Sequence, residues 1–507
     1  MGLWSFYFLA KVYLSFRGYI RFAFLLNVLF AGFLLLPLPH KLPARRFFRV
    51  MRFVFGVIIA SLILWHETWF PSLRTTLQLL AETGGISPSY IIRFLKNSVS
   101  IMEVIILLLI LAACILLNKR ITLTPLALAG MCAVLLFGAK GAPSDIGAYL
   151  EQFYRSESKR VIHFSEPDAN RPDFDVIILN ICSLSWDDLR AVHMDNDPFL
   201  KQFDLLFTNF NTVSAHTTPS AIRLLRAACG QTRHDDLYRE TRNECYPLEA
   251  LRRNGYVTYA AIDNDAPSYR FVEDIIAHGR ADKPIEMRDL PIRQIDFDNT
   301  PIYDDLAILN RWWDMRLRSP SARAALYADL TTLHGGAHWV NDAQWWKKDR
   351  KIYYREFAQR LFSNLSTFFR TVAESGRNAV VIMIPEHGMA LRGSSIQSPE
   401  VREIPLPSIT TVPAGIKFIG RGFPGVPDRQ IVVSKQTSYY AYAHLLSAFL
   451  TSPVFNRDAL LPETTIKEIP ETTFVSENAD ALIAKKDGVL FFFGKDKKWT
   501  ELPLTVQ

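Results

Sequence analysis

The chain has 507 residues, of which 49% are hydrophobic and 21% charged, and 57 Lys and Arg against 50 Asp and Glu give a formal net charge of +7. These averages hide a division, because residues 1–140 hold long apolar runs whereas residues 170–507 read as a soluble globular sequence. This excludes a fully disordered chain, a coiled coil and a repeat solenoid, and the small basic excess, which sits mainly near the apolar runs, does not indicate nucleic-acid binding.

Five apolar stretches follow one another in the N-terminal part, at about 3–17, 20–38, 48–65, 100–118 and 121–138. Because a helix needs about 20 apolar residues to span a bilayer, residues 1–140 are predicted to form a transmembrane domain of about five helices. The first stretch is the weakest, since it is short and carries Lys11. It also lacks the small-residue cleavage site of a signal peptide.

Basic residues in the connections between the apolar stretches predict how the helices are oriented in the membrane. Lys and Arg gather between positions 41 and 52, and Lys119 and Arg120 separate the fourth and fifth stretches. Cytoplasmic connections carry such an excess, so both are placed on the cytoplasmic side. The loop 66–99 and everything after Gly138 then face the other side of the membrane.

Cysteine usage fits an oxidising exterior. Cys229 and Cys245 lie sixteen residues apart, both outside the membrane, and could form a disulfide. Cys182 is then left unpaired, which calls for a reason: it is either buried and inert or a metal ligand.

Residues 141–172 read as a linker with a lead-in helix, and residues 173–507 read as one domain in which strands alternate with helices. Strands are predicted at 174–181, 256–262, 324–330 and 379–384, helices at 221–229, 303–318, 351–376 and 438–450, and a terminal strand pair at 488–493 and 499–504. This alternation predicts an α/β fold with a mostly parallel sheet.

Residues that carry chemistry follow the ends of three predicted strands. Cys182 follows the first, His334 lies a little beyond the third, and Glu386 and His387 follow the fourth. Sites in open α/β sheets form at the carboxyl ends of the strands, and thiolate, carboxylate and imidazole are the ligand types of zinc. Taken singly, Cys182 could be a small core residue, Glu386 and His387 could form a turn with solvated side chains, and His334 could be a polar loop residue; their joint occurrence is more informative than any one of them.

The segment Thr217-Thr218-Pro219 suggests a nucleophile. Pro is favoured at the first helical position and Thr is a natural cap before it, so a threonine hydroxyl is predicted at a helix N-terminus. That position favours an anion, and a nearby cation would activate the hydroxyl. Ordinary N-capping is the simpler interpretation of this motif alone.

Several strings along the soluble domain resemble the bacterial cellulose phosphoethanolamine transferase family, inner-membrane enzymes of the alkaline-phosphatase/sulfatase-like superfamily. The strings that carry the resemblance are Asn180–Trp186, Ala221–Ala227, Cys229–Thr232, Tyr303–Asp305, Leu309–Trp312, Pro385–Gly388, Pro407–Thr410 and Val475–Asn478, with Phe6–Phe8 and Leu36–Pro39 in the membrane half. The resemblance implies an alkaline-phosphatase-like α/β/α sandwich in the periplasm, behind a multi-pass inner-membrane domain.

The resemblance also implies roles for individual residues. Cys182, Glu386 and His387 match the family's Zn²⁺ ligands, and Thr217 takes the position of the nucleophile that also contacts the metal, with Thr218 as its rival. His334 matches an active-site histidine and Arg402 an arginine suited to a phosphate, and the Cys229–Cys245 spacing matches the family's disulfide.

The implied reaction has two steps. Thr217 attacks phosphatidylethanolamine and releases diacylglycerol, and a glucose 6-hydroxyl of nascent cellulose then displaces the threonine. Subunits of the cellulose synthase complex are the implied partners. Two alternatives stay open: transfer to another glycan or lipid, or to water as in a phosphatase, and a structural subunit of a secretion complex without turnover.

Overall fold

The structure is a computed structural model. It describes residues 4–37, 45–68, 101–137, 145–165, 173–264, 270–420, 430–452, 454–455, 463–495 and 497–502, together with Gly2. Most of the predicted loop 66–99 and parts of the predicted linker 141–172 lie outside the described residues.

A mixed sheet of eight strands forms the centre of the C-terminal part, in the order β10-β2-β9-β8-β1-β6-β3 with β11 beside β2. The strands are β1 (Asp175–Ile181), β2 (Leu205–Asn211), β3 (Val257–Ile262), β6 (Ala324–Leu330), β8 (Ala379–Pro385), β9 (Thr411–Ile419), β10 (Ile431–Val433) and β11 (Thr437–Ser438). All pairs are parallel except that β9 runs antiparallel to both β2 and β8. The four predicted strands are β1, β3, β6 and β8, whereas β2 and β9 were not predicted.

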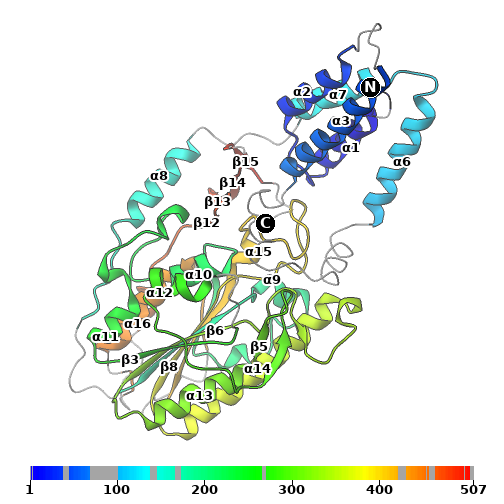
Figure 1. Ribbon diagram of the computed structural model, residues 1–507. Helices are drawn as coiled ribbons and strands as arrows, with labels where there is room; N and C mark the ends of the chain where they lie inside the picture. The colour runs from blue at the N-terminus through cyan, green and yellow to red at the C-terminus, as the bar shows by residue number, and fades with distance from the viewer. Residues whose placement is uncertain are drawn as a thin grey trace.

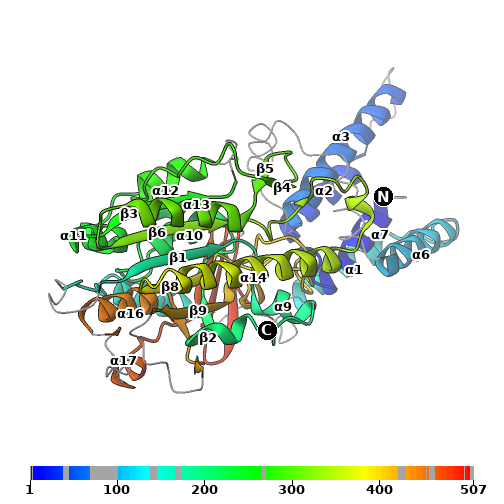
Figure 2. The ribbon, with the colours of Figure 1, turned by 90° about the horizontal axis from the view of Figure 1, so that it is seen from below.

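Helices cover both faces of this sheet (Figures 1 and 2). One face carries α10 (Thr217–Leu225), α11 (Pro247–Arg253), α12 (Phe271–Gly279) and α16 (Tyr439–Thr451), and the other carries α9 (Trp186–Ala191), α13 (Asp305–Arg318) and α14 (Arg350–Glu374). Alternate residues of β1 enter the two cores, Val176 and Ile178 on one face and Ile177 and Leu179 on the other. With both faces covered, β1 is buried along its whole length, which explains its continuous apolar run.

A buried charge cluster closes the amino end of β1. Asp175 accepts hydrogen bonds from Arg316 Nε at 2.8 Å and from Arg377 Nε at 2.9 Å. Asp175 and Arg316 are almost fully buried. The carboxylate therefore has two guanidinium partners, which a buried charge requires.

Two smaller sheets lie beside the main one. The first joins β12 (Val475–Asn478), β13 (Ala481–Lys486), β14 (Val489–Phe493) and β15 (Trp499–Glu501), and the second joins β4 (Ile292–Ile295), β5 (Pro301–Tyr303) and β7 (His338–Trp339). The predicted terminal strand pair is β14 and β15, which are antiparallel. The remaining short helices are α15 (Pro407–Thr410) and α17 (Glu463–Lys467), with 3₁₀ turns at Leu200–Gln202, His234–Asp236, Asn243–Cys245 and Trp345–Lys347.

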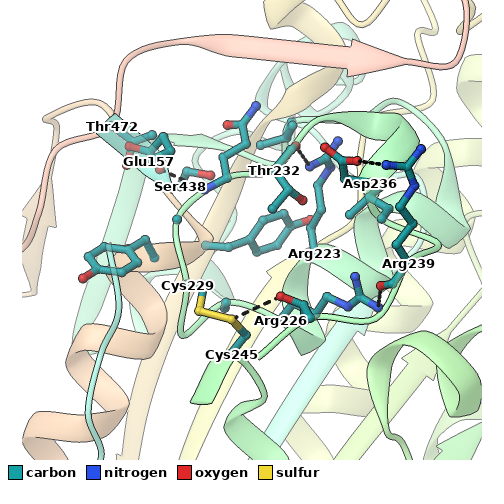
Figure 3. A pocket seen from close by; sticks show the side chains of 18 of the residues that line it. Glu157, Arg223, Arg226, Cys229, Thr232, Asp236, Arg239, Cys245, Ser438 and Thr472 are labelled. Atoms are coloured by element: carbon teal, nitrogen blue, oxygen red, sulfur yellow. Dashed lines mark hydrogen bonds and ion pairs between the residues drawn. A yellow bond between two sulfur atoms is a disulfide. The ribbon is translucent and has the colours of Figure 1, made fainter. Parts of the chain in front are cut away.

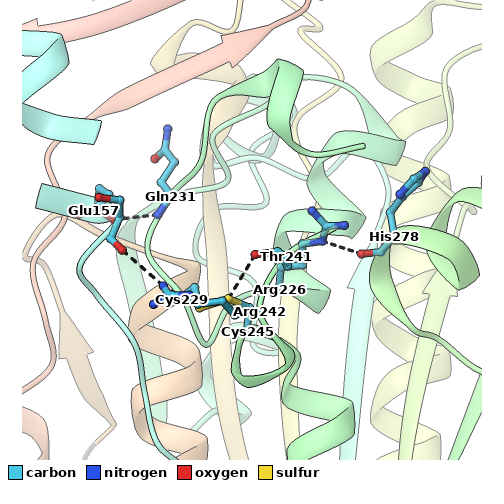
Figure 4. The surroundings of a disulfide bond; sticks show 9 residues. Glu157, Arg226, Cys229, Gln231, Thr241, Arg242, Cys245 and His278 are labelled. Atoms are coloured by element: carbon cyan, nitrogen blue, oxygen red, sulfur yellow. Dashed lines mark hydrogen bonds between the residues drawn. A yellow bond between two sulfur atoms is a disulfide. The ribbon is translucent and has the colours of Figure 1, made fainter. Parts of the chain in front are cut away.

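The predicted lead-in helix is α8 (Ile146–Glu157), which packs on the β12–β15 sheet through Leu150, Phe153 and Tyr154. Its last residue meets the loop closed by the predicted disulfide, which forms between Cys229 and Cys245 (Figure 4). There the Gln231 N–H donates to Glu157 Oε2 at 2.9 Å. The disulfide loop thus holds the end of the linker against the domain.

Each of the five predicted apolar stretches contains a helix. They are α1 (Trp4–Phe16), α2 (Phe24–Leu35), α3 (Arg45–Glu67), α6 (Ile101–Leu117) and α7 (Thr124–Phe137). Among the described helices, the span Arg46–Glu67 alone is long and apolar enough to cross a membrane by itself, with a mean hydropathy of 2.1 over its most apolar window. The multi-helix domain is therefore found as helices, and five separate spans remain a prediction.

A buried polar cluster explains the charge in the first helix. Lys11 Nζ lies 2.5 Å from Glu67 Oε2 and donates to Asn27 Oδ1 at 2.5 Å. All three side chains are buried between α1, α2 and α3. Because Lys11 has an anionic partner, it does not prevent this helix from lying in an apolar bundle.

Candidate metal centre and active site

The three predicted metal ligands come together at the carboxyl end of the main sheet. Cys182, Glu386 and His387 are buried and offer ligand atoms that all lie within 4.8 Å of one another. The strands explain this, because β1 and β8 are parallel neighbours with Ile181 opposite Pro385. The residues that directly follow the two strands must therefore lie side by side.

The turn after β8 is fixed by a buried carboxylate. Asp188 accepts the N–H groups of Met389 at 2.6 Å and Leu391 at 2.9 Å. Gly388 has no room for a side chain, since an added Cβ would lie 2.4 Å from Ser185 Oγ and 2.5 Å from Asp188 Oδ2. Burial raises the pKa of Asp188 to about 6. The glycine is thus required for close approach, which permits two consecutive residues to face one site.

Thr217 reaches this cluster from the other side. Its Oγ1 lies 3.8 Å from Cys182 Sγ and 3.2 Å from His387 Nε2. Among the described residues, no hydrogen bond joins Thr218 to the cluster. Of the two threonines that the sequence left open as nucleophile, the geometry therefore favours Thr217.

The predicted start and end of the nucleophile's helix were wrong. α10 begins at Thr217, with His216 as its N-cap and no side-chain capping bond, so Pro219 is its third residue. Pro is tolerated there because the first four N–H groups of a helix have no intrahelical partner. The helix ends at Leu225, before Cys229, which is held in a bridge to Val161 and in the disulfide.

A hydrogen-bonded cluster of buried polar residues holds Glu386 in place. Asn180 donates from Nδ2 to Glu386 Oε1 at 2.8 Å and to Asp329 Oδ2 at 2.7 Å, and the Tyr327 hydroxyl donates to the same Asp329 oxygen at 3.0 Å. Sequence reasoning missed these residues. The available signal was a polar side chain near the end of an otherwise apolar buried strand, β1 for Asn180 and β6 for Asp329.

The site fits a divalent cation. Glu386 Oε2 is buried, lies 3.6 Å from His387 Nε2 and has no hydrogen-bond partner among the described residues. Burial raises the pKa of Cys182 and of Glu386, with the charge of Asp329 adding to the second shift, and burial lowers the pKa of His387. A cation would reverse the first two shifts, because it stabilises thiolate and carboxylate. His387 Nδ1 lies 3.0 Å from the Gly388 carbonyl, so a proton on Nδ1 would leave the lone pair on Nε2, the atom that faces Thr217 Oγ1 at 3.2 Å, as the one that a cation would take.

Of the two further predicted site residues, Arg402 contacts the cluster directly. Arg402 Nη1 lies 2.8 Å from His387 Nδ1 and 2.9 Å from Nε2. His334 lies in the loop after β6, where its backbone carbonyl accepts a hydrogen bond from Arg350 Nη2 at 3.1 Å; the same Nη2 lies 3.8 Å from Met389 Sδ, in the turn that follows His387. His338 lies elsewhere, in β7, where its ring stacks on Trp345 at 4.5 Å.

A separate cavity of about 200 Å³ lies at the far end of α10, beside the disulfide (Figure 3). Arg223 and Arg226 line it, whereas Thr217 and the three candidate ligands do not. Arg223 is paired with Glu477 at 3.0 Å and Arg239 with Asp236 at 3.0 Å. This cavity is therefore distinct from the candidate metal centre.

Comparison with known families matches two models along the chain. "Cellulose biosynthesis protein BcsG N-terminal domain" matches residues 4–136, and "Cellulose biosynthesis protein BcsG C-terminal domain" matches residues 139–499. The cellulose biosynthesis protein BcsG of Escherichia coli (strain K12) is 31% identical over 529 residues, which cover 95% of this chain and 92% of that protein.

Two solved structures show a weaker likeness. A protein of the alkaline phosphatase superfamily from Vibrio parahaemolyticus has a TM-score of 0.49 at 13% identity, covering 72% of this chain and 92% of that one. The integral membrane protein lipooligosaccharide phosphoethanolamine transferase A of Neisseria meningitidis has a TM-score of 0.44 at 12% identity, covering 88% of this chain and 96% of that one. Likenesses of this size leave the function to be argued from the site itself.

Proposed function

The chain belongs to the BcsG family of cellulose biosynthesis proteins, and from that premise we propose that it transfers phosphoethanolamine from phosphatidylethanolamine to glucose 6-hydroxyl groups of nascent cellulose. It is a phosphoethanolamine transferase with Thr217 as its covalent nucleophile. The observation that carries the proposal is the position of the Thr217 hydroxyl, which opens α10 and faces a buried thiol, carboxyl and imidazole.

Cys182, Glu386 and His387 would hold Zn²⁺, with Thr217 completing the set. A thiolate, a carboxylate and an imidazole are ligands that zinc accepts in a tetrahedral site with one open position. When bound, the ion supplies charge that favours ionisation of the Thr217 hydroxyl and neutralises phosphoryl oxygens. Thr217 itself sits at a helix N-terminus, whose free N–H groups and dipole also favour negative charge.

The chain's own residues account for the two chemical steps. In the first, Thr217 Oγ1 forms a bond to phosphorus and the bond to the diacylglycerol oxygen breaks. In the second, a glucose O6 forms the new bond and the bond to Thr217 Oγ1 breaks. Arg402, as a permanent cation beside His387, would hold the non-bridging phosphoryl oxygens in both steps.

A multi-pass position in the bacterial inner membrane agrees with the helices of residues 4–137. Large apolar side chains are exposed on each of the five, for example Phe16, Leu25, Phe53, Leu109 and Leu136. An exposed apolar surface of this kind suits lipid and not water. The domain boundaries proposed are residues 1–140 for the membrane domain, 141–172 for the linker and 173–507 for the periplasmic catalytic domain.

Contacts between the two parts support the proposed orientation. The Arg21 guanidinium lies 5.0 Å from the ring centre of Phe492 in β14, and Gly18 is packed close to the backbone of Ser395. The connection between α1 and α2 therefore faces the catalytic domain. This is the side expected when the N-terminus and the basic connections are cytoplasmic, and it keeps the site near its lipid donor.

Cellulose as the acceptor, and subunits of the cellulose synthase complex as partners, follow from the family alone. A transferase to another glycan or lipid, or a phosphatase that uses water, would keep the same first step. A structural subunit would not form the adduct at all. Glu386 Oε2, which is buried and accepts no hydrogen bond from the described residues, lies beside the possible metal ligands Cys182 and His387, and this favours catalysis over that alternative.

The test is intact-mass spectrometry of the purified full chain after incubation with phosphatidylethanolamine and Zn²⁺. We expect a mass increase of one phosphoethanolamine group on the peptide that holds Thr217, with release of diacylglycerol. The adduct should be absent in Thr217→Ala and present in Thr218→Ala, which is the matched control at the next hydroxyl. An adduct that persists in Thr217→Ala would contradict the assignment of the nucleophile.

The fate of the adduct separates the alternatives. Transfer to cello-oligosaccharides supports the proposed acceptor, whereas rapid loss to water in the absence of a glycan identifies a phosphatase. If the zinc-loaded chain forms no adduct and releases no diacylglycerol, the result would indicate a structural subunit.

A further inference from the structure

The β4–β5 hairpin brings a buried carboxylate to the active-site histidine. Asp296, directly after β4, has Oδ1 3.0 Å and Oδ2 2.9 Å from His334 Nδ1. Asp296 is 2% exposed, while His334 retains 18% of its side-chain exposure. Among the ion pairs of the described residues, His334 is the one basic partner of this carboxylate. A buried carboxylate with a single partner of this kind fixes the partner's orientation.

Both members of the pair are held rigidly by their own segments. The Asp296 N–H donates to the Thr300 carbonyl at 2.9 Å, and the Phe297 N–H donates to Asp296 Oδ1 at 2.8 Å. On the other side, the His334 N–H donates to the Thr331 carbonyl at 2.7 Å. The contact therefore joins two ordered turns.

Two more buried carboxylates fix the loop that carries the histidine. Thr331 Oγ1 donates to Asp263 at 2.7 Å, and Thr332 Oγ1 donates to Asp305 at 2.7 Å. The Thr332 carbonyl accepts from Gln294 in β4 at 3.0 Å. The loop after β6 is thereby tied both to the main sheet and to the hairpin that supplies Asp296.

We propose that Asp296 is a positioning residue for proton transfer: it accepts the Nδ1–H of His334, so that Nε2 carries the proton exchanged with the departing and entering oxygen atoms. This inference rests on the proposed function. Nε2 has no hydrogen-bond partner among the described residues, so it is free for this role. The arrangement is the one by which a carboxylate selects the tautomer of a catalytic imidazole.

The proton balance closes over the two steps. In the first, ionised Thr217 attacks phosphorus, the bond to the diacylglycerol oxygen breaks, and His334, an imidazolium at the start, gives its Nε2 proton to that oxygen and becomes the neutral Nδ1–H tautomer. In the second, the acceptor hydroxyl gives its proton to Nε2 while its oxygen bonds to phosphorus and Thr217 leaves ionised. Each cycle returns His334 and Thr217 to their starting states, with no other reactant required.

The experiment compares two donors that differ in the need for this proton. Phosphatidylethanolamine has an alkoxide leaving group that must be protonated, whereas 4-nitrophenyl phosphoethanolamine releases a stable nitrophenolate. We expect Asp296→Asn to slow adduct formation from the lipid by about 10²-fold or more, the range of general acid catalysis, and to change the rate with the nitrophenyl donor little. Asp298→Asn is the matched control, because Asp298 lies in the same turn and bonds Thr300 without touching His334.

A second variant tests whether Asp296 acts through the histidine. His334→Gln should show the same dependence on the donor, and the double variant should be no slower than His334→Gln alone, since residues that act as a unit are not additive. Equal slowing with both donors, or additive effects in the double variant, would overturn the positioning role while leaving Thr217 chemistry intact. If the wild-type chain forms no adduct with either donor, the proposed function itself fails.

Discussion

Gly388→Ala is the substitution for which the structure gives the clearest expected cost. The new Cβ would lie 2.4 Å from Ser185 Oγ and 2.5 Å from Asp188 Oδ2, where ordinary contact begins at 3.4 Å. One side must move by about 1 Å, as expected for overpacking in a dense interior. Either the hydrogen bonds from the Met389 and Leu391 N–H groups to Asp188 weaken, or the turn that carries Glu386 and His387 shifts.

The size of the effect follows from these two outcomes. Overpacking costs about 1 to 3 kcal/mol and the loss of a hydrogen bond to a charged group costs about 1.5 to 3 kcal/mol. We therefore expect the free energy of unfolding to fall by about 3 kcal/mol. A shift of about 1 Å in the ligands greatly exceeds the tolerance of a zinc site, about 0.2 Å, so zinc affinity should fall and adduct formation should slow by about 10²-fold.

The assay is zinc content by mass spectrometry, unfolding in detergent and the adduct rate on the same preparation. Gly335→Ala is the matched control, because its Cβ would meet only the flexible end of Met389, at 2.6 Å from Cε. A displaced side-chain tip costs less than displaced backbone partners. Wild-type zinc content and rate in Gly388→Ala, with a loss below about 1 kcal/mol, would refute the reasoning.

Three further predictions concern stability, each measured by unfolding of the full chain in detergent. Replacing Cys229 and Cys245 together by Ser should cost about 3 kcal/mol, because the disulfide closes a loop of sixteen residues; equal stability of the oxidised wild type and the variant would contradict this. Asp175→Asn should cost about 3 to 5 kcal/mol by leaving Arg316 without its buried partner, with the adduct rate unchanged because the site lies at the other end of β1. Burial lowers the pKa of His234 from 6.5 to about 4, so the folded state favours the neutral imidazole. The part of the free energy of unfolding that depends on this neutral form is fully present above pH 6.5 and is lost as the pH falls towards 4. At pH 5 the wild type should have lost about 2 kcal/mol more than His234→Gln relative to pH 7.5, and equal losses would show that His234 does not titrate in this way.

The parts of the site that were predictable from the sequence lie directly after long apolar strands. A buried parallel strand is recognisable from its composition, and the residue after it must lie at the active edge of the sheet. This is why Cys182 and Glu386 could be assigned to one place although they are distant in sequence. Strands β2 and β9 were missed although they are as long as the others, because polar residues, proline or glycine interrupt their apolar runs.

The start of α10 was harder to predict, because local rules conflict with tertiary contacts there. Capping preferences favoured a helix beginning at Pro219, yet the helix begins at Thr217, whose hydroxyl faces Cys182 and His387. Intrinsic preferences for a cap amount to about 1 kcal/mol, which packing around a buried site readily exceeds. Disagreement between a local rule and the fold is expected where function is located.

Asp296 illustrates a limit of another kind. Its segment, Ile292–Tyr303, is a short hairpin without a long apolar run, and nothing in its composition relates it to a histidine 38 residues later. The relation exists only because β4 pairs with both β5 and β7, a small sheet that brings the hairpin and the segment after His334 together. Ligands supplied by regular strands can therefore be read from one sequence, whereas a residue that orients a ligand or an acid from an irregular turn requires the fold.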